Sequence, residues 1–580
     1  AGDDYEITSL INDIRDEVAR WRALPNPAQW HVTPATARLL QHWREHDFEG
    51  IRPFFCQIEA VETAIWLAEV APNLGKRSRR FLDHLKGANA EANPKLFRIA
   101  LKLATGAGKT AVMAMLIAWQ AVNAARSPNS KHFTHGFLVV APGITIRDRL
   151  RVLHPNDPES YYDKRELVPT DMLPDVRRAK VVIVNYHAFL KRERMPLARG
   201  TRQAIEGHAD PVETRETDGQ MVQRALGDLM GMRNILVIND EAHHCYRAKP
   251  GSTGIETLKG DEKAEAKENE EAARVWISGL EAVKRQIGVR TVYDLSATPF
   301  FLAGSGYDEG TLFPWTVSDF SLMDAIESGI VKLPRVPVAD SQTGKGPVLY
   351  RKLWDRIGKK MPKKGGARKP DPAMLPLELQ VALDALYGHY EGTFHEWRKA
   401  RIAVPPVFIV VCNNTVNSQL LYEYIAGYER EDEHGTTDFT EGRFDLFRNY
   451  TAEGDRLQRP NTLLIDSARL ESGAGIDPRF RDAFADEIEL FRREKAQREG
   501  AEAARDVTDE EILREAMNTV GREGRLGEQI RCVVSVSMLT ESWDANTVTH
   551  IMGFRAFGTK LICEQVIGRG LRRLSYDLMQ

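Results

Sequence analysis

Residues 103–110 read Leu-Ala-Thr-Gly-Ala-Gly-Lys-Thr. They end the apolar segment FRIALKL (97–103) and lead into the helical pattern AVMAMLIAW (111–119). A chance Gly-Lys-Thr loop between a strand and a helix would be the plainest explanation of such a stretch. The order of strand, glycine-rich loop and helix favours a phosphate-binding loop instead, in the short TGxGKT form.

Each residue type in this loop has a physical role in holding a nucleotide. Gly106 and Gly108 allow the backbone N–H groups around Ala107 to turn inward around a phosphate. Lys109 has the length to reach the β and γ oxygens, and the Thr110 hydroxyl can hold Mg²⁺. We therefore expect ATP and Mg²⁺ as the bound species.

A nucleotide site of this kind also needs carboxylates at the end of a buried strand. Residues 235–243 (ILVINDEAH) supply them. Asp240 is expected in the Mg²⁺ shell, and Glu241 beside it is expected to activate the attacking water. The neighbouring His243, His244 and Cys245 could suggest a metal centre, but three consecutive residues do not easily surround one tetrahedral ion.

A third element is Ser296-Ala-Thr-Pro299, which follows another predicted strand. Serine and threonine are common in turns, so the stretch is weak by itself. Its position after the other two motifs makes Ser296 and Thr298 candidates for coupling nucleotide state to movement.

Short apolar runs alternate with helical stretches in two parts of the chain, as in parallel sheets covered on both faces. The sequence therefore predicts an α/β fold with two sheets, a helical start over 1–50 and helical or irregular insertions. The predicted strands after the first are 137–141, 181–185, 235–239, 292–295, 407–412, 462–465 and 532–536.

The composition excludes a disordered or fibrous protein, because 42% of the 580 residues are hydrophobic and 28% are charged. The net charge of −3 argues against a uniformly basic nucleic-acid binder, but not against a basic groove. Charge is concentrated locally: 351–370 is strongly basic and 261–271 is acidic, the latter resembling a solvated helical insertion. Thr508 and Glu511 are spaced as a capping box.

The five cysteines (Cys56, Cys245, Cys412, Cys532 and Cys563) are scattered and form no CxxC pair, which favours reduced thiols in a cytoplasmic protein. Apolar runs are far shorter than the roughly 20 residues that span a bilayer, so no membrane association is expected. The acidic start is unlike a signal peptide. The chain begins at Ala1, so we expect a processed or partial chain.

Together, GxGKT, DEAH, SAT and a second α/β part ending in 565–572 (QVIGRGLR) resemble a superfamily 2 helicase or translocase. More narrowly, 52–66, 315–335 and 534–550 resemble the helicase-bearing Res subunit of type III restriction enzymes. The resemblance spans roughly residues 30–580 and implies two tandem RecA-like lobes of the P-loop NTPase class. The domains expected from it are a helical segment 1–92, lobe 1 at 93–305, a linker at 306–404, and lobe 2 at 405–580 with an insert near 478–528.

The resemblance also implies roles for individual residues. Gln57 would read the adenine edge, with Phe54 or Phe55 packing on the base, and Asp544 would contact the ribose, although Ser542 stands where relatives often carry glycine. The phosphate, magnesium, catalytic, coupling and cleft-lining positions it implies are Gly106, Ala107, Gly108, Lys109, Thr110, Asp240, Glu241, Ser296, Thr298, Gln565, Arg569 and Arg572.

Two arginines three residues apart fit the needs of phosphoryl transfer. Arg569 and Arg572 can face the same side of a helix and act as arginine fingers, worth about 10³–10⁵ in rate. Without the other motifs, the simpler explanation of Arg569 and Arg572 would be two surface arginines. Fingers on a different lobe from Lys109 would make hydrolysis depend on lobe closure.

The nucleic-acid track is expected at loops that follow predicted strands, where backbone and hydroxyl groups can contact phosphates without reading bases. A simple loop cap is an equally good explanation of each. The basic run 351–370 is a further candidate contact. The candidate loop residues are Pro142, Gly143, Asn185, Tyr186, His187, Asn413, Asn414, Thr415 and Thr540.

The hypothesis from sequence is an ATP-dependent DNA translocase or helicase, the motor of a type III restriction-like anti-phage system. Its expected partners are DNA and a methyltransferase or specificity subunit, or other defence proteins. No nuclease triad is evident, so we expect the nuclease domain C-terminal to this chain. The alternatives are an RNA helicase and a nucleotide-gated nucleic-acid clamp or scaffold that does not move.

Overall fold

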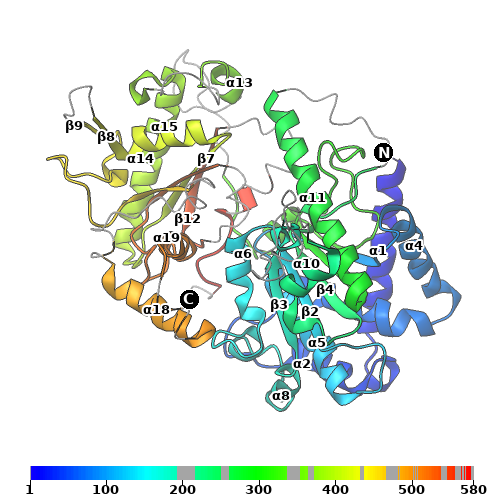
Figure 1. Cartoon of the computed structure of the whole chain (residues 1–580). Helices are drawn as coiled ribbons and strands as arrows, with labels where there is room; N and C mark the ends of the chain where they lie inside the picture. Colours follow the sequence, from blue (N-terminus) through cyan, green and yellow to red (C-terminus); the bar gives the residue numbers. More distant parts are fainter. Residues whose placement is uncertain are drawn as a thin grey trace, which may run out of the picture. The chain divides into compact units, whose positions relative to one another are not determined.

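The chain divides into two compact units, Ala1–Ala325 and Ile326–Gln580, in a computed structural model of its 580 residues (Figure 1). Each unit has a parallel sheet of its own. The structure describes residues 2–192, 216–249, 260–335, 353–362, 371–431, 437–465, 481, 484–500, 502, 504–505, 507–536, 545–554, 564, 567–568 and 570–576.

The first unit opens with four helices, and the first two lie within 1–50, where the apolar spacing predicted helix. Ile11, Ile14, Val18 and Trp21 lie on the buried face of the first of them. Thr33 caps the second helix by accepting a hydrogen bond from the N–H of Thr36. The helices are α1 (Gly2–Arg22), α2 (Pro34–Glu45), α3 (Phe55–Ile65) and α4 (Lys76–Ala92).

A parallel sheet of six strands forms the centre of the first unit, in the order β3-β2-β4-β5-β1-β6. Its last strand lies in the segment expected to be linker, so the first unit extends beyond the expected boundary at residue 305. The strands are β1 (Arg98–Leu103), β2 (Gly136–Ala141), β3 (Lys180–Asn185), β4 (Ile235–Asp240), β5 (Val289–Ser296) and β6 (Thr316–Phe320).

Helices cover both faces of this sheet, because right-handed crossovers in opposite directions place their helices on opposite sides (Figure 1). Helix α5 (Lys109–Arg126) follows the phosphate loop and packs with α2 and α3. Helices α10 (Asp218–Ala225) and α11 (Gly260–Ile287) share the other face with β2, β4 and β5. The shorter helices are α6 (Ile144–Arg149), α7 (Tyr161–Lys164), α8 (Leu173–Val176) and α12 (Leu322–Glu327).

The acidic run 261–271 is helical, as expected, but it is continuous with a core element. It begins the 28-residue helix α11, whose later turns bury Trp276, Leu280 and Val283. One helix therefore carries an acidic start and a buried apolar half.

The second unit contains a parallel sheet of four strands in the order β10-β11-β7-β12 and a separate hairpin. The runs predicted at 407–412, 462–465 and 532–536 coincide with three of these strands. The strands are β7 (Val407–Cys412), β8 (Gly427–Glu431), β9 (Thr437–Glu441), β10 (Thr462–Ile465), β11 (Cys532–Val536) and β12 (Val548–Phe554).

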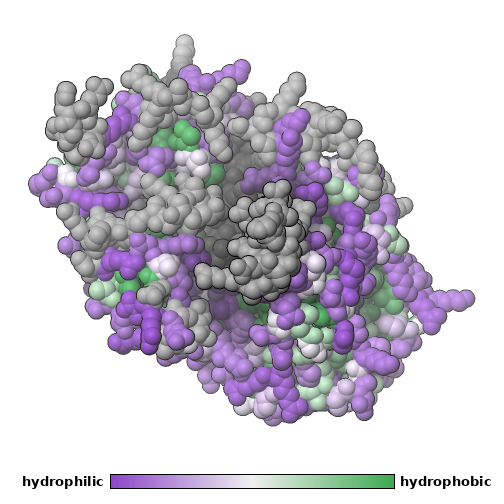
Figure 2. Space-filling model, in the orientation of Figure 1, coloured by the Kyte–Doolittle hydropathy of each residue, from purple (hydrophilic) through white to green (hydrophobic). Residues whose placement is uncertain are grey.

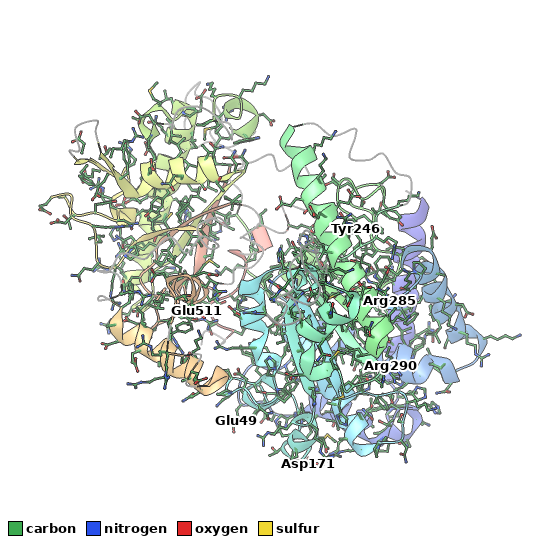
Figure 3. The ribbon with its side chains drawn as sticks, in the orientation of Figure 1. Glu49, Asp171, Tyr246, Arg285, Arg290 and Glu511 are labelled. Atoms are coloured by element: carbon green, nitrogen blue, oxygen red, sulfur yellow. The ribbon has the colours of Figure 1, made fainter. Side chains whose placement is uncertain are left out.

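Helix α14 (Leu377–Lys399) lies in the segment expected to be linker, yet Leu379, Leu383 and Tyr390 pack into the core of the second unit. The capping box is confirmed: Thr508 and Glu511 satisfy each other's backbone N–H at the start of α19 (Glu511 is labelled in Figure 3). The remaining helices are α13 (Leu353–Ile357), α15 (Thr415–Ala426), α18 (Ala485–Glu499) and α19 (Asp509–Asn518). Both units are α/β, and the fold is two RecA-like lobes with helical additions.

Hydrophilic side chains dominate the described surface on the face shown in Figure 2. Among the described helices none is long and apolar enough to cross a membrane. Cys56, Cys245, Cys412 and Cys532 are buried free thiols, as the scattered spacing predicted.

Candidate nucleotide site

The phosphate loop joins β1 to α5, as predicted. Gly106 and Gly108 hold φ values of 89° and 81°, in the left-handed region that favours glycine. A Cβ at Gly108 would lie 2.2 Å from Nε2 of Gln57, so a side chain there would displace this amide from its bond to the carbonyl of Ala107. Lys109 and Thr110 form the first turn of α5, where helix N–H groups favour an anion.

Lys109 and Glu241 contact each other across the site. The Lys109 ammonium donates a hydrogen bond to Oε1 of Glu241 at 2.7 Å, and their side chains are only 12% and 9% exposed. The structure thus brings together two residues that are 132 positions apart and that the sequence assigned to the same chemistry. Partial burial strengthens the pair relative to a surface ion pair.

Asp240 and Glu241 lie where β4 ends, at the same edge of the sheet as the phosphate loop. Asp240 is buried, and its Oδ1 accepts the backbone N–H of Glu241 at 3.1 Å. Glu241 has φ 47° and ψ 51°, a left-handed conformation that is strained for a residue with a Cβ. The turn therefore aims Glu241 at Lys109 at an energetic cost.

His243 and Ser296 join the second and third motifs directly. Nδ1 of His243 lies 2.9 Å from Oγ of Ser296, and the same Oγ accepts the backbone N–H of Thr298 at 3.0 Å. All three residues are buried. In the described part of the chain, no group of three or more His, Cys, Asp or Glu residues could hold a metal ion without a nucleotide.

Gln57 holds the phosphate loop to the start of α3 through its side-chain amide. Its Nε2 donates to the carbonyl of Ala107 at 2.8 Å, while its Oε1 accepts the N–H of Phe54 at 3.0 Å at the start of α3. Phe55 is exposed, with its ring edge-on to Phe320 at 5.4 Å. An exposed aromatic ring beside the loop can pack on a base, and Gln57 keeps one N–H beyond the bond to Ala107.

Sequence reasoning missed a buried charged pair in β1 and β5, the strands that precede the phosphate loop and the SAT turn. Nε of Arg98 in β1 donates to Oδ2 of Asp294 in β5 at 2.8 Å, and both side chains are fully buried. The same carboxylate accepts Nε1 of Trp315 and Nδ2 of Asn239, each at 2.8 Å. Charged and amide residues inside otherwise apolar strands were the signal that could have found this network.

The loops expected to contact nucleic acid are placed at strand ends within their own units. Pro142 and Gly143 follow β2, and Asn185 ends the neighbouring β3, which pairs with it in register. In the second unit Asn414 caps α15 by accepting the N–H of Asn417 at 2.9 Å, and Asn413 accepts the Asn417 amide. Asn414 is therefore a helix cap, and contact of Asn413 with nucleic acid stays a prediction.

The C-terminal motif is described only in part. Thr540, Asp544, Gln565 and Arg569 lie outside the described residues, whereas Arg572 is half-buried and forms a β-bridge with Val331.

Lys332, which the sequence did not single out, binds this segment through its side chain. Its ammonium donates to the carbonyls of Asn546 and Val548 at 2.9 Å, and its backbone N–H donates to Leu571. Burial lowers the pKa of Lys332 to about 8.

The fold and this site define a helicase-like P-loop ATPase class: a glycine-rich loop, a DEAH turn and a SAT turn lie together at the carboxyl edge of a parallel sheet. The family described as the type III restriction enzyme, res subunit, matches residues 51–301. The match contains Gln57, the phosphate loop and both following motifs, and it confirms the resemblance to a helicase-bearing Res-like protein. No curated protein matches the chain.

Proposed function

We propose that this chain is an ATP-dependent DNA translocase or helicase, the motor of a type III restriction-like anti-phage system. The observation that carries the proposal is the contact of Lys109 with Glu241 at 2.7 Å, between a phosphate loop and a strained DEAH turn. Backbone strain of this kind is found at functional sites. The match to the Res family over 51–301 supports the restriction context.

ATP and Mg²⁺ fit the residues present. The left-handed glycines 106 and 108 give the loop the turn that a phosphate cradle needs, while the N–H of Ala107 between them donates to the carbonyl of Ala104 at 3.1 Å. Thr110 and Asp240 would hold the ion. The ion supplies charge neutralisation for the phosphates.

Hydrolysis follows from a change of partner by Lys109. While Lys109 is paired with Glu241, its ammonium occupies Oε1 of the carboxylate, the oxygen type that would have to accept a proton from the attacking water. A bound γ-phosphate competes for Lys109 and leaves Glu241 to accept a proton from water. The contact between His243 and Ser296 links this event to the turn that carries Thr298.

Arg569 and Arg572 are proposed as the arginine fingers, with Gln565 and Asp544 as nucleotide contacts of the second lobe. We further propose DNA as the substrate track, contacted without base readout by the loops after β2 and β3. A methyltransferase or specificity subunit is the proposed partner, and the cytoplasm the proposed location.

The test compares ATP hydrolysis by the wild-type chain and Glu241→Gln with double-stranded DNA, single-stranded DNA and RNA. Loss of a general base should lower turnover by about 10²–10⁴ while ATP binding and a long-lived DNA complex remain. Glu91→Gln, at an exposed position in α4, is the matched control and should leave turnover unchanged.

Three outcomes would contradict parts of the proposal. Undiminished turnover of Glu241→Gln would remove Glu241 as the base. Stimulation by RNA alone would favour an RNA helicase. ATP hydrolysis that displaces neither a DNA strand nor a bound protein would favour a nucleotide-gated clamp.

A further inference from the structure

An aromatic stack leads from an exposed loop into the first unit. Tyr186 begins the turn after β3, in the loop expected to meet nucleic acid. Its ring centroid lies 4.0 Å from that of the exposed His187 and 5.7 Å from that of Trp276 in α11, and the Tyr186 and Trp276 planes are 4° from parallel. The stack therefore has one end in solvent and the other in the core.

Trp276 connects this stack to the residue before the catalytic carboxylates. Trp276 is fully buried, and its Nε1 donates to Oδ1 of Asn239 at 3.1 Å. Asn239 directly precedes Asp240 in β4, and its Nδ2 donates to Asp294, two residues before Ser296. We call the series Tyr186, Trp276 and Asn239 the Trp276 path.

The Trp276 path contains a buried amide, Asn239, that packing alone does not require. An apolar residue at Asn239 would suit a buried parallel strand, because burying an amide costs free energy unless its polar atoms are paired. Here the two neighbours satisfy both ends of the amide, one as donor and one as acceptor. Removal of the indole N–H leaves the Asn239 oxygen without that donor.

Helix α11 is also held tightly against the loop. A Cβ at Gly279 would lie 2.3 Å from the ring of Phe189, in the same turn as Tyr186. Close packing of this kind transmits small shifts rather than absorbing them. A displacement of the 186–189 turn therefore moves α11 and the Trp276 side chain with it.

We propose that Trp276 is a positioning residue that couples nucleic-acid contact at Tyr186 and His187 to the carboxylates Asp240 and Glu241. Contact at the loop fixes the aromatic stack, and the indole N–H then holds Asn239 and the end of β4 in the hydrolytic arrangement. The inference rests on the proposed function, since it concerns how a polymer stimulates ATP hydrolysis.

The test measures the ATPase rate of the full chain without polymer and with saturating double-stranded DNA, together with DNA affinity. Trp276→Phe keeps the ring and removes the N–H. We expect the stimulation factor to fall by about 5-fold or more, the size of a typical coupling between sites. The rate without DNA, the KM for ATP and the DNA affinity should stay within about twofold, since none of these requires the coupling.

Trp119→Phe is the matched control. Trp119 lies in α5 of the same unit, is buried, and donates its Nε1 to Glu69, away from the Trp276 path. It should lose similar stability without losing stimulation. Tyr186→Leu is a second test of the coupling if Trp276→Phe folds poorly. The stimulation factor of the double variant should equal that of the single variant with the lower factor, because both substitutions break one path.

Full stimulation in both Trp276→Phe and Tyr186→Leu would overturn the coupling and leave the proposed function intact. Equal losses of basal and stimulated rates would also overturn it, since they indicate a structural role. A wild-type chain whose ATPase responds to no polymer would instead overturn the proposed function, and the coupling with it.

Discussion

Glu241 adopts a backbone conformation that residues with a Cβ rarely hold, and it does so in contact with Lys109. The strain is sustained by its neighbours: Asp240 binds its N–H, and the turn that follows packs in the core. At the residue scale the site is thus preorganised, with the Glu241 carboxylate held next to the Lys109 ammonium.

Gly108→Ala should disable nucleotide binding for two physical reasons. Alanine at φ 81° costs about 1–2 kcal/mol, and its Cβ would collide with the Gln57 amide. We expect ATP affinity, measured by fluorescent-nucleotide titration, to fall by about tenfold or more. Gly87→Ala, in α4 with nothing within 4 Å of the new Cβ, is the control, and equal ATP affinity in both variants would contradict this account.

His550 gives a pH dependence that is independent of the nucleotide site. Burial, and secondarily the neighbouring His389, lower the pKa of His550 to about 4. Between about pH 6.5 and 4 the unfolded chain therefore binds a proton that the folded chain does not. The unfolding free energy should fall as the pH is lowered through this range, by up to about 1.4 kcal/mol per unit.

Urea unfolding at pH 7.5 and pH 5 checks the prediction for His550. The His550→Asn variant, which cannot titrate, should lose this part of the pH dependence, although it also loses the stack on Phe408. If both proteins show the same fall between the two pH values, another group is responsible.

At the scale of elements, the first sheet is held by polar contacts inside its strands as well as by apolar packing. Arg98 in β1 and Asp294 in β5 are 196 positions apart and pair across neighbouring strands. A second bond from Arg98 reaches the carbonyl of Cys245, just after the DEAH turn. The network therefore ties the strand before the phosphate loop to β5 and to the segment that follows Asp240 and Glu241.

Asp294→Asn should be strongly destabilising, because it leaves Arg98 buried without a compensating charge. Breaking such a pair costs about 3–5 kcal/mol, measured by chemical denaturation. Asp171→Asn is the control (Asp171 is labelled in Figure 3): its pair with Arg38 is half exposed, so its loss should cost about 1 kcal/mol or less. If the two variants lose similar amounts of unfolding free energy, the buried pair contributes no more to stability than the exposed one.

At the scale of the whole molecule, the net charge of −3 conceals opposed local charges. The basic run 351–370 is described only at 353–362, where α13 forms and where Lys359 and Lys360 are exposed. Lys360 donates to Glu378 at 2.6 Å, so part of its charge is already neutralised. Lys363 and Lys364 lie outside the described residues.

Replacing Lys359, Lys363 and Lys364 together by alanine should flatten the salt dependence of DNA binding, by about 0.9 in the log–log slope for each phosphate that no longer has a lysine partner. Binding titrations at several salt concentrations measure this slope. Lys360→Ala is the control and should change the slope less, because Glu378 already pairs with it. An unchanged slope in the triple variant would show that this run does not contact DNA.

Much of the fold was predictable because it is locally encoded. Apolar runs of strand length, the glycine loop before an apolar helical stretch and the capping box of α19 depend on neighbours a few residues away. The predicted strands agree with β2, β3, β7, β10 and β11 to within a residue at either end. The phosphate loop and the DEAH and SAT turns were found for the same reason, since each follows such a strand.

The tertiary structure alone decided which distant segments pair. β6 joins the first sheet next to β1 from a segment that reads as linker, because a short edge strand has little sequence signal of its own. The partners of Asn239 are Trp276 and Asp294, 37 and 55 positions away, and no local pattern specifies which buried polar groups will meet. The sequence by itself thus determined the three motifs and most of the strands that present them, because both are local patterns, whereas burial between distant elements decided how those motifs are held together.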